Sequence, residues 1–122
     1  MSIVRIATIC AVLALGVLPG EATAPHFKIT IENGAPYFLP ASATVQTGTP
    51  ILWDNPTPTE HTITHESCIG GEPCAFDSGL MPPNTHYTLP GLPPGRYAYY
   101  CRIHPIMRGT LIITDSAVPP QI

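Results

Sequence analysis

The chain has 122 residues and a formal net charge of −3, with 8 acidic residues against 5 basic ones. This length suits one small domain with a single core. The mild acidity argues against a nucleic-acid-binding protein, which would carry a basic stripe.

The first 24 residues have the order of a secretory signal: one positive charge at Arg5, an apolar run over residues 6–18, and then small residues. The apolar run is 13 residues long, whereas a membrane-spanning helix needs roughly 20. We therefore predict a signal peptide over residues 1–24 that is cleaved after Ala22 or Ala24. The mature protein is then exported, periplasmic or extracellular, and has no stable membrane insertion.

Beyond the signal, short runs of alternating apolar and polar residues end at Gly, Pro, Asn or Asp, as strands do. These runs cover residues 26–32, 43–47, 51–55, 61–65, 86–89, 96–101 and 110–114. They indicate an all-β fold, a Greek-key antiparallel β-sandwich or barrel of about seven or eight strands. We place this domain at residues 25–114, followed by a C-terminal tail at residues 115–122.

Three cysteines remain once the signal is removed: Cys68, Cys74 and Cys101. Export places them in an oxidising compartment, where cysteines tend to pair. Two glycines and a proline between Cys68 and Cys74 suit a tight loop, so we expect a disulfide there; the alternative is two unpaired thiols. This pairing leaves Cys101 alone, and a metal ion would occupy it.

Cys101, His104 and Met107 place three metal-ligand residue types at a spacing of three. Pro105 cannot continue a strand ladder, so the three lie on one loop at the end of the sandwich. Copper sites for electron transfer use two His, one Cys and a weak axial Met, and we expect the second imidazole from His61 on a neighbouring strand. The alternatives are a buried free thiol, a core methionine and a strand-end histidine.

The stretches "WDNPTPTEHTI" and "FDSGLMPPNTHYTLPGLPPGRYAYYCRIHPIMRGTLIIT" resemble the plastocyanin, amicyanin and pseudoazurin branch of the cupredoxins, the type 1 blue copper proteins. The short Cys-x-x-His-x-x-Met loop is similar to that of amicyanins and pseudoazurins. The resemblance implies one type 1 copper, with His61, Cys101 and His104 as strong equatorial ligands and Met107 as the weak axial ligand.

Thr62 departs from the family pattern, which often has Asn after the first His ligand. The Thr62 backbone N–H can still donate to the Cys101 sulfur, and its hydroxyl can replace part of the amide's role. Bonds around the ligands tune reduction potential and rigidity. The departure therefore affects those two properties rather than copper binding.

The resemblance also implies an apolar rim around the edge of His104, where a redox partner docks. Its expected members are Leu80, Met81, Pro82, Ile103, Pro105 and Ile106. Arg102 and Arg108 flank the rim and can favour acidic partner surfaces; the alternative is ordinary solvated charge. His65, on the expected strand of His61, is a candidate for a second, weak metal contact.

These features predict a monomeric carrier of single electrons that has no substrate chemistry of its own and is not an enzyme. Its expected partners are redox proteins such as a c-type cytochrome or a dehydrogenase or reductase. Two rivals remain open. One is a periplasmic copper carrier or buffer that uses the same ligands, and the other is a metal-free cupredoxin-like interaction module.

Overall fold

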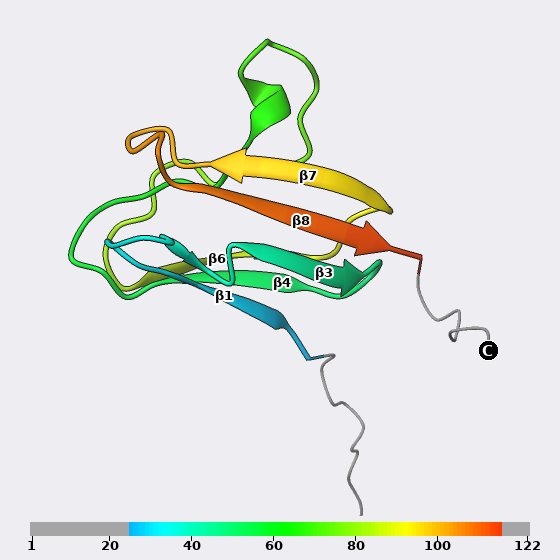
Figure 1. Ribbon diagram of the computed structural model, residues 1–122, viewed down its shortest axis with the longest axis horizontal. Helices are drawn as coiled ribbons and strands as arrows, with labels where there is room; N and C mark the ends of the chain where they lie inside the picture. Colours follow the sequence, from blue (N-terminus) through cyan, green and yellow to red (C-terminus); the bar gives the residue numbers. More distant parts are fainter. Residues whose placement is uncertain (1–24, 116–122) are drawn as a thin grey trace, which may run out of the picture.

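The short alternating runs form strands, as Figure 1 shows for the computed structural model, which describes residues 25–115. The strands are β1 (Phe27–Ile31), β2 (Phe38–Leu39), β3 (Ser42–Gln46), β4 (Ile51–Asn55), β5 (Thr64–His65), β6 (Thr85–Leu89), β7 (Gly95–Tyr100) and β8 (Arg108–Thr114). A 3-10 turn, η3 (Glu66–Cys68), follows β5. The predicted signal and nearly all of the predicted tail lie outside the described residues. Within residues 25–115, no helix has the length and apolar character needed to cross a membrane.

Two four-stranded sheets form a β-sandwich, which confirms the predicted fold class, with strand orders β2-β1-β4-β6 and β3-β8-β7-β5. Both sheets are mixed rather than purely antiparallel, because β1 pairs with β4 and β3 with β8 in parallel. Parallel neighbours require a crossover between them, and the chain makes one by passing through the opposite sheet. Side chains alternate with a period of two residues in both parallel and antiparallel strands. The alternation in the sequence therefore could not show which strands run parallel.

All seven predicted runs contain a strand, but one is much shorter than expected. In segment 61–65 only Thr64 and His65 form a strand, and His61 is joined to Met81 by an isolated bridge. Strand β2 was not predicted, because its two residues are too few to show alternation.

The core lies between the sheets and is centred on aromatic rings. Trp53 of β4 is fully buried, and its ring meets that of Tyr99 of β7 edge-on, with centroids 5.4 Å apart. Phe76 and Tyr87 pack around the same indole at 5.9 and 6.0 Å. Edge-to-face pairs of this kind add to the hydrophobic term of burial. Trp53 and Tyr99 therefore hold one sheet against the other close to the end where Cys101 lies.

Gly109 allows this packing, because it lies opposite Tyr99 in the β7–β8 ladder. A Cβ at Gly109 would overlap the ring of Tyr99. The aromatic ring thus covers a bare stretch of backbone, a known way to stabilise a glycine in a sheet.

The structure joins Cys68 and Cys74 by a disulfide with an S–S distance of 2.07 Å. The bridge closes the loop that carries η3, and this loop projects from the sandwich beside β7 (Figure 1).

Replacing both cysteines, Cys68→Ser with Cys74→Ser, is expected to lower the free energy of unfolding by about 2 kcal/mol. The loop is short, and the stabilisation from cross-linking the unfolded chain rises only slowly with loop length. Urea unfolding of the metal-free protein measures the loss, and reduction of the unsubstituted protein by a thiol is the control. A loss above about 4 kcal/mol would show that the bridge does more than restrict the unfolded chain.

Candidate metal centre

The loop after β7 brings its candidate ligands together through its own backbone. The Cys101 N–H donates to the Met107 carbonyl at 3.1 Å, the His104 N–H to the Cys101 carbonyl at 3.3 Å, and the Met107 N–H to the His104 carbonyl at 2.8 Å. Each of these bonds joins two candidate ligand residues of the segment 101–107, called the ligand loop below. The loop is therefore a tight, self-supporting turn at one end of the sandwich.

His61 reaches the same place from a different part of the chain. Strand β5 pairs with the end of β7, with Thr64 opposite Tyr100, so the segment ahead of β5 runs beside the ligand loop. The His61 backbone exchanges two hydrogen bonds with Met81, at 3.3 and 2.8 Å. In the folded chain His61 lies next to Cys101, although 40 residues separate them in the sequence.

The donor atoms converge on one small space. The Cys101 Sγ lies 3.9 Å from the Nδ1 of His61 and 3.6 Å from the Nδ1 of His104. The candidate ligand atoms of the three residues all lie within 4.8 Å of one another. With bond lengths of about 2.0 Å to nitrogen and about 2.3 Å to sulfur, as in zinc sites, a trigonal ion needs N and S about 3.7 Å apart. The three residues therefore fit a single metal ion.

Met107 supplies a fourth candidate ligand, because it is only 2% exposed and lines the same cavity as both histidines. This cavity, of about 290 Å³, also has Asn33, Tyr37 and Thr59 in its wall. Two imidazoles, a thiol and a thioether form the donor set of a type 1 copper site. The sequence-predicted ligands thus lie together at one end of the protein.

The far nitrogen of His61 is held by polar groups that sequence reasoning missed. Its Nε2 lies 3.0 Å from the Thr59 hydroxyl, 3.1 Å from the Thr57 hydroxyl and 3.2 Å from the Asn33 Oδ1. These acceptors favour a proton on Nε2, which leaves Nδ1 free to bind metal. The only signal was two threonines, spaced two and four residues before His61, in the Pro-containing segment between two predicted strands.

The Asn55 side chain stabilises the segment 55–59 that precedes His61. Its buried side chain donates to the carbonyls of Thr59, Met81 and Pro82, and its Oδ1 accepts from the backbone and hydroxyl of Thr57. A buried amide with all of these bonds made is rigid, because losing any one would leave an unpaired polar group. Asn55 therefore ties together the two segments that position His61.

Burial, together with the neighbouring His104, lowers the pKa of His61 below its ordinary value. The ring is therefore neutral near pH 7, which is the form that binds a metal ion.

The Thr62 N–H donates to the Cys101 Sγ at 3.3 Å, and the Thr62 hydroxyl accepts from the Arg102 N–H at 2.8 Å. Both contacts expected of Thr62 are present. A hydroxyl at this position thus ties the two ligand segments together, where the family often uses an amide.

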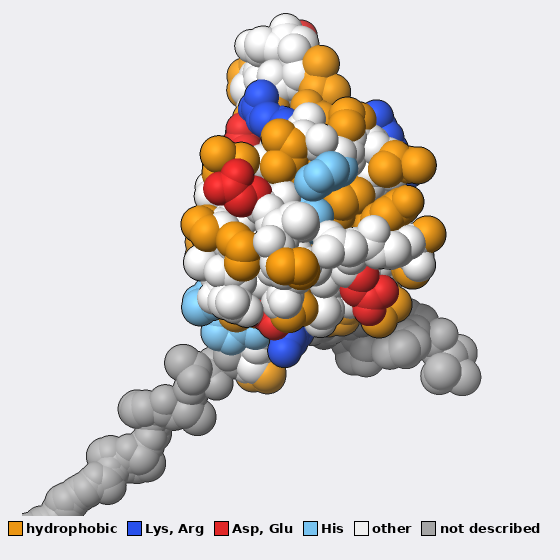
Figure 2. Space-filling view, turned by 90° about the vertical axis from the view of Figure 1, so that its left-hand side faces the viewer, with side chains coloured by type: hydrophobic (Ala, Val, Ile, Leu, Met, Phe, Trp, Pro, Cys, Tyr) orange, Lys and Arg blue, Asp and Glu red, His pale blue; other side chains and the backbone are white. Residues whose placement is uncertain are grey.

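At the end of the molecule that carries the ligand loop, hydrophobic side chains gather around a surface histidine (Figure 2). Ile106 is 72% exposed, Leu80 59% and Ile103 47%, and Pro82 and Pro105 are also exposed. His104 is half-buried among them. Figure 2 shows histidine atoms at the surface of this face, with hydrophobic side chains around them.

Met81 does not belong to this rim, contrary to the sequence-based expectation. It is only 4% exposed and is part of the hydrophobic core. The reason is its backbone bridge to His61, which draws Met81 inward while its neighbours Leu80 and Pro82 stay outside.

Arg102 and Arg108 each have a carboxylate partner. Arg102 pairs with Asp77 at 2.6 Å, and Arg108 pairs with Glu66 and lies over the ring of Tyr100. The positive charges beside the rim are therefore balanced locally, which weakens the expected preference for acidic partners.

His65 does not join the metal centre, because among the described residues only His61, Cys101 and His104 form a group of metal-binding side chains. Its ring stacks on Phe76 with centroids 5.2 Å apart, and its Nδ1 accepts from the Ala75 N–H at 3.0 Å. His65 thus anchors the disulfide loop to the sandwich. Burial lowers the pKa of His65, although the charge of Glu66 opposes the shift.

The stability of the metal-free protein is expected to fall as the pH drops below about 6.5, the ordinary pKa of histidine. Since His61 and His65 have lowered pKa values in the folded state, the unfolded chain binds more protons in that range. Their contribution is complete above the unfolded pKa and is lost as the pH falls through the folded pKa. Urea unfolding at pH 5, 6 and 7 measures the slope, and His65→Gln should make it shallower. An identical slope in that variant would exclude a role for His65.

A family model described as a cupredoxin-like domain matches residues 5–113. The chain therefore belongs to the cupredoxin-like family. It is 28% identical over 109 residues to the chloroplastic plastocyanin of Tetradesmus obliquus, covering 84% of this chain and 75% of that protein. It is 25% identical over 103 residues to amicyanin-alpha of Methylorubrum extorquens, covering 84% and 86%.

Solved structures agree on the fold. A purple cupredoxin from Nitrosopumilus maritimus is similar with a TM-score of 0.64 at 24% identity, covering 72% of this chain and 99% of that one. A reduced amicyanin variant is similar with a TM-score of 0.63 at 22% identity, covering 77% and 87%.

Proposed function

We propose that this protein carries single electrons between redox partners through one type 1 copper bound by His61, Cys101, His104 and Met107. The observation that carries the proposal is the convergence of two imidazole nitrogens and a thiol within 4.8 Å. The backbone hydrogen bonds of the ligand loop and the contacts of His61 support this arrangement. Amicyanin structures of similar fold are described in Cu(I), reduced and oxidised forms.

The donor set suits electron transfer because it satisfies both oxidation states. Thiolate and thioether favour Cu(I), and imidazole accepts either state. The fold holds the ligand side chains in fixed positions. Cys101, Met107 and His61 are at most 2% exposed, so water has little access to them and the ligands rearrange little when an electron moves.

The half-buried His104 is the ligand nearest to solvent, and the exposed side chains of Ile103 and Ile106 surround it. We assign the passage of electrons to this edge. Partners of the proposed carrier are redox proteins with an apolar contact surface, such as a c-type cytochrome, a dehydrogenase or a reductase. Export to the periplasm or the extracellular space, directed by residues 1–24, is part of the same proposal.

The test begins with one equivalent of Cu(II) added to the mature chain. We expect an intense blue thiolate-to-copper band and a narrow copper hyperfine splitting in the electron paramagnetic resonance spectrum. Ascorbate should bleach the band, and an oxidised c-type cytochrome should restore it with the copper retained after gel filtration.

Other outcomes would support one of the two alternative functions, the copper carrier or buffer and the metal-free interaction module. Loss of copper to a mild chelator, without reversible oxidation, would indicate a copper carrier or buffer. A colourless protein with an ordinary tetragonal copper signal would contradict the type 1 site and leave the interaction module.

A further inference from the structure

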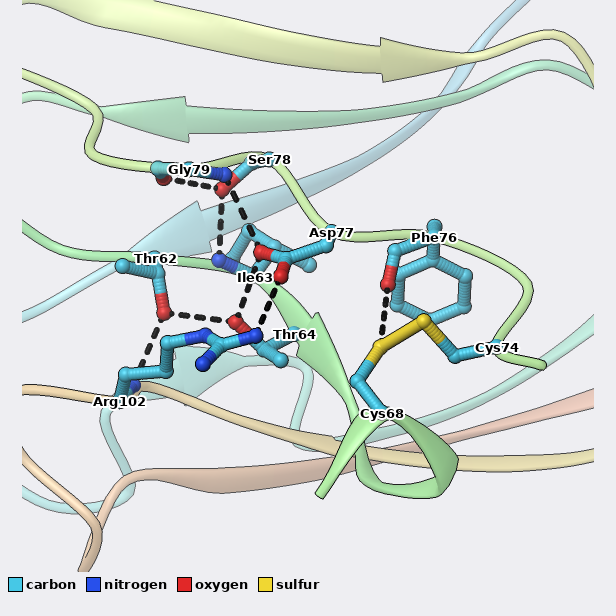
Figure 3. A network of polar contacts seen from close by, with 10 residues as sticks. All are labelled: Thr62, Ile63, Thr64, Cys68, Cys74, Phe76, Asp77, Ser78, Gly79 and Arg102. Carbon is cyan, nitrogen blue, oxygen red and sulfur yellow. Dashed lines mark hydrogen bonds and ion pairs between the residues drawn. A yellow bond between two sulfur atoms is a disulfide. The ribbon is translucent and has the colours of Figure 1, made fainter. Parts of the chain in front are cut away.

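Four residues outside the ligand set are linked into a closed polar ring (Figure 3). They are Thr62, Thr64, Asp77 and Arg102. Thr62 and Thr64 are 2% and 0% exposed, whereas the side chains of Asp77 and Arg102 are 31% and 49% exposed. The ring therefore runs from the buried thiolate ligand to the surface.

The hydrogen bonds of the ring have one direction. The Thr64 hydroxyl donates to the Asp77 Oδ1 at 3.1 Å, which uses its only proton. Across the 2.9 Å contact between the two hydroxyls, Thr62 must then be the donor. The Thr62 oxygen in turn accepts from the Arg102 N–H at 2.8 Å. The chain of donors thus ends on the carboxylate, and bonds aligned in this way strengthen one another.

Asp77 also binds the other end of Arg102. Its Oδ2 accepts from the guanidinium at 2.6 Å, and its Oδ1 accepts from the Gly79 N–H at 3.2 Å. Burial alone would raise the pKa of Asp77, but the Gly79, Arg102 and Thr64 donors together lower it, so it is ionised at neutral pH. Arg102 is therefore held at both its backbone and its side chain by one carboxylate and the threonines linked to it.

The ring lies close to the Cys101 sulfur through the backbone N–H groups of Thr62 and Arg102. Arg102 directly follows Cys101, and the Thr62 N–H donates to the Cys101 Sγ at 3.3 Å. The hydroxyl of the same Thr62 holds Arg102. Any shift of this threonine therefore changes both the path of the chain at Cys101 and the length of the N–H···S bond.

We propose that Asp77 and Thr64 are positioning residues of the metal centre: through Thr62 they set the hydrogen bond to the Cys101 sulfur and hence the reduction potential. The inference deepens the proposed function and rests on it. Hydrogen bonding at the cysteine sulfur tunes the potential of such sites. A lengthened N–H···S bond leaves more electron density on the thiolate, which favours Cu(II) and lowers the potential.

Two variants interrupt the ring at different points. Thr64→Val removes a hydroxyl with little change of shape, and Asp77→Ala removes the carboxylate at the surface. The control variant Thr64→Ser keeps the hydroxyl and is expected to keep the wild-type properties. Asp54→Ala is the matched control, because Asp54 is 35% exposed, pairs with Lys28 at 4.0 Å and has no contact with the ring.

The first readout needs no copper. In the metal-free protein, hydrogen exchange of the Arg102 amide should be at least about tenfold faster in Thr64→Val and Asp77→Ala. The reason is that the Thr62 hydroxyl, which accepts from this amide, is then no longer held in place by Thr64 and Asp77. The Asp54→Ala control should exchange as the wild type does. If Asp77→Ala does not fold, Asp77→Asn, which keeps the shape of the side chain, replaces it.

The second readout is the potential and the visible spectrum of the copper-loaded protein. We expect both ring variants to raise the ratio of Cu(II) to Cu(I) affinity by about threefold to tenfold, where tenfold lowers a one-electron potential by 59 mV. A shifted thiolate-to-copper band should accompany the change. An ion pair with no role beyond surface stability would move neither quantity.

The two proposals fail in different ways. Potentials and bands equal to those of the wild type in both variants, with the blue centre intact, would overturn the positioning role alone. A wild-type protein without a blue band would overturn the electron-carrier proposal. In that case hydrogen exchange of the Arg102 amide tests whether the ring positions Arg102. An exchange rate that is unchanged in the variants would overturn the positioning role as well.

Discussion

Replacing Cys101 by Ser is expected to abolish the blue thiolate-to-copper band and to widen the copper hyperfine splitting. Both signatures require a thiolate, and a serine hydroxyl at neutral pH stays protonated and binds Cu(I) poorly. The Cu(I) affinity should fall by more than about 10–100-fold, which is the loss caused by removing a residue that only hydrogen-bonds to a metal ligand. Visible absorption, electron paramagnetic resonance and competition with a Cu(I) chelator measure these changes.

The matched control is the variant with Cys68→Ser and Cys74→Ser, which removes the other cysteines of the described chain and keeps Cys101. It should retain the blue band. A band that survives in Cys101→Ser, or that disappears only in the control, would place the copper thiolate elsewhere.

Replacing Trp53 by Ala is expected to lower the free energy of unfolding by about 3–5 kcal/mol. The indole is fully buried and contacts rings from both sheets. Its removal leaves a cavity that the two sheets can close only in part. Urea unfolding followed by circular dichroism measures the loss, because the variant has no other tryptophan to report by fluorescence.

Trp53→Phe is the control that separates packing from polarity. Within residues 25–115, the Trp53 Nε1 has no hydrogen-bond partner, so phenylalanine keeps a ring in place and removes the cost of a buried, unpaired N–H. It should be much less destabilising than alanine. Equal losses in the two variants would mean that the indole, rather than an aromatic ring, is required.

The ligand loop was accessible from the sequence because its chemistry is local. Cys101, His104 and Met107 lie within seven residues, and Pro105 among them excludes a continuous strand there. His61 was harder to predict and depended on the expectation that its strand would neighbour β7. The pairing of β5 with β7 provides that neighbour.

The groups around the ligands could not be predicted in the same way. Asn33, Thr57 and Thr59 are ordinary turn residues in the sequence, and they meet at the Nε2 of His61 only in the folded chain. Met81 lies between two exposed neighbours in an apolar segment. Whether it pointed outward or inward depended on a backbone bridge to a residue 20 positions away.

The β class, the tight cysteine loop and the candidate ligand residues could be predicted from the sequence alone, because alternation, turn residues and ligand spacing are properties of short segments. The folded protein was needed to show which strands run parallel, which nitrogen of His61 faces the sulfur, and how Asp77 is linked to Cys101. The reason is physical: hydrogen bonds between distant segments depend on ångström-scale positions that packing of the whole core sets.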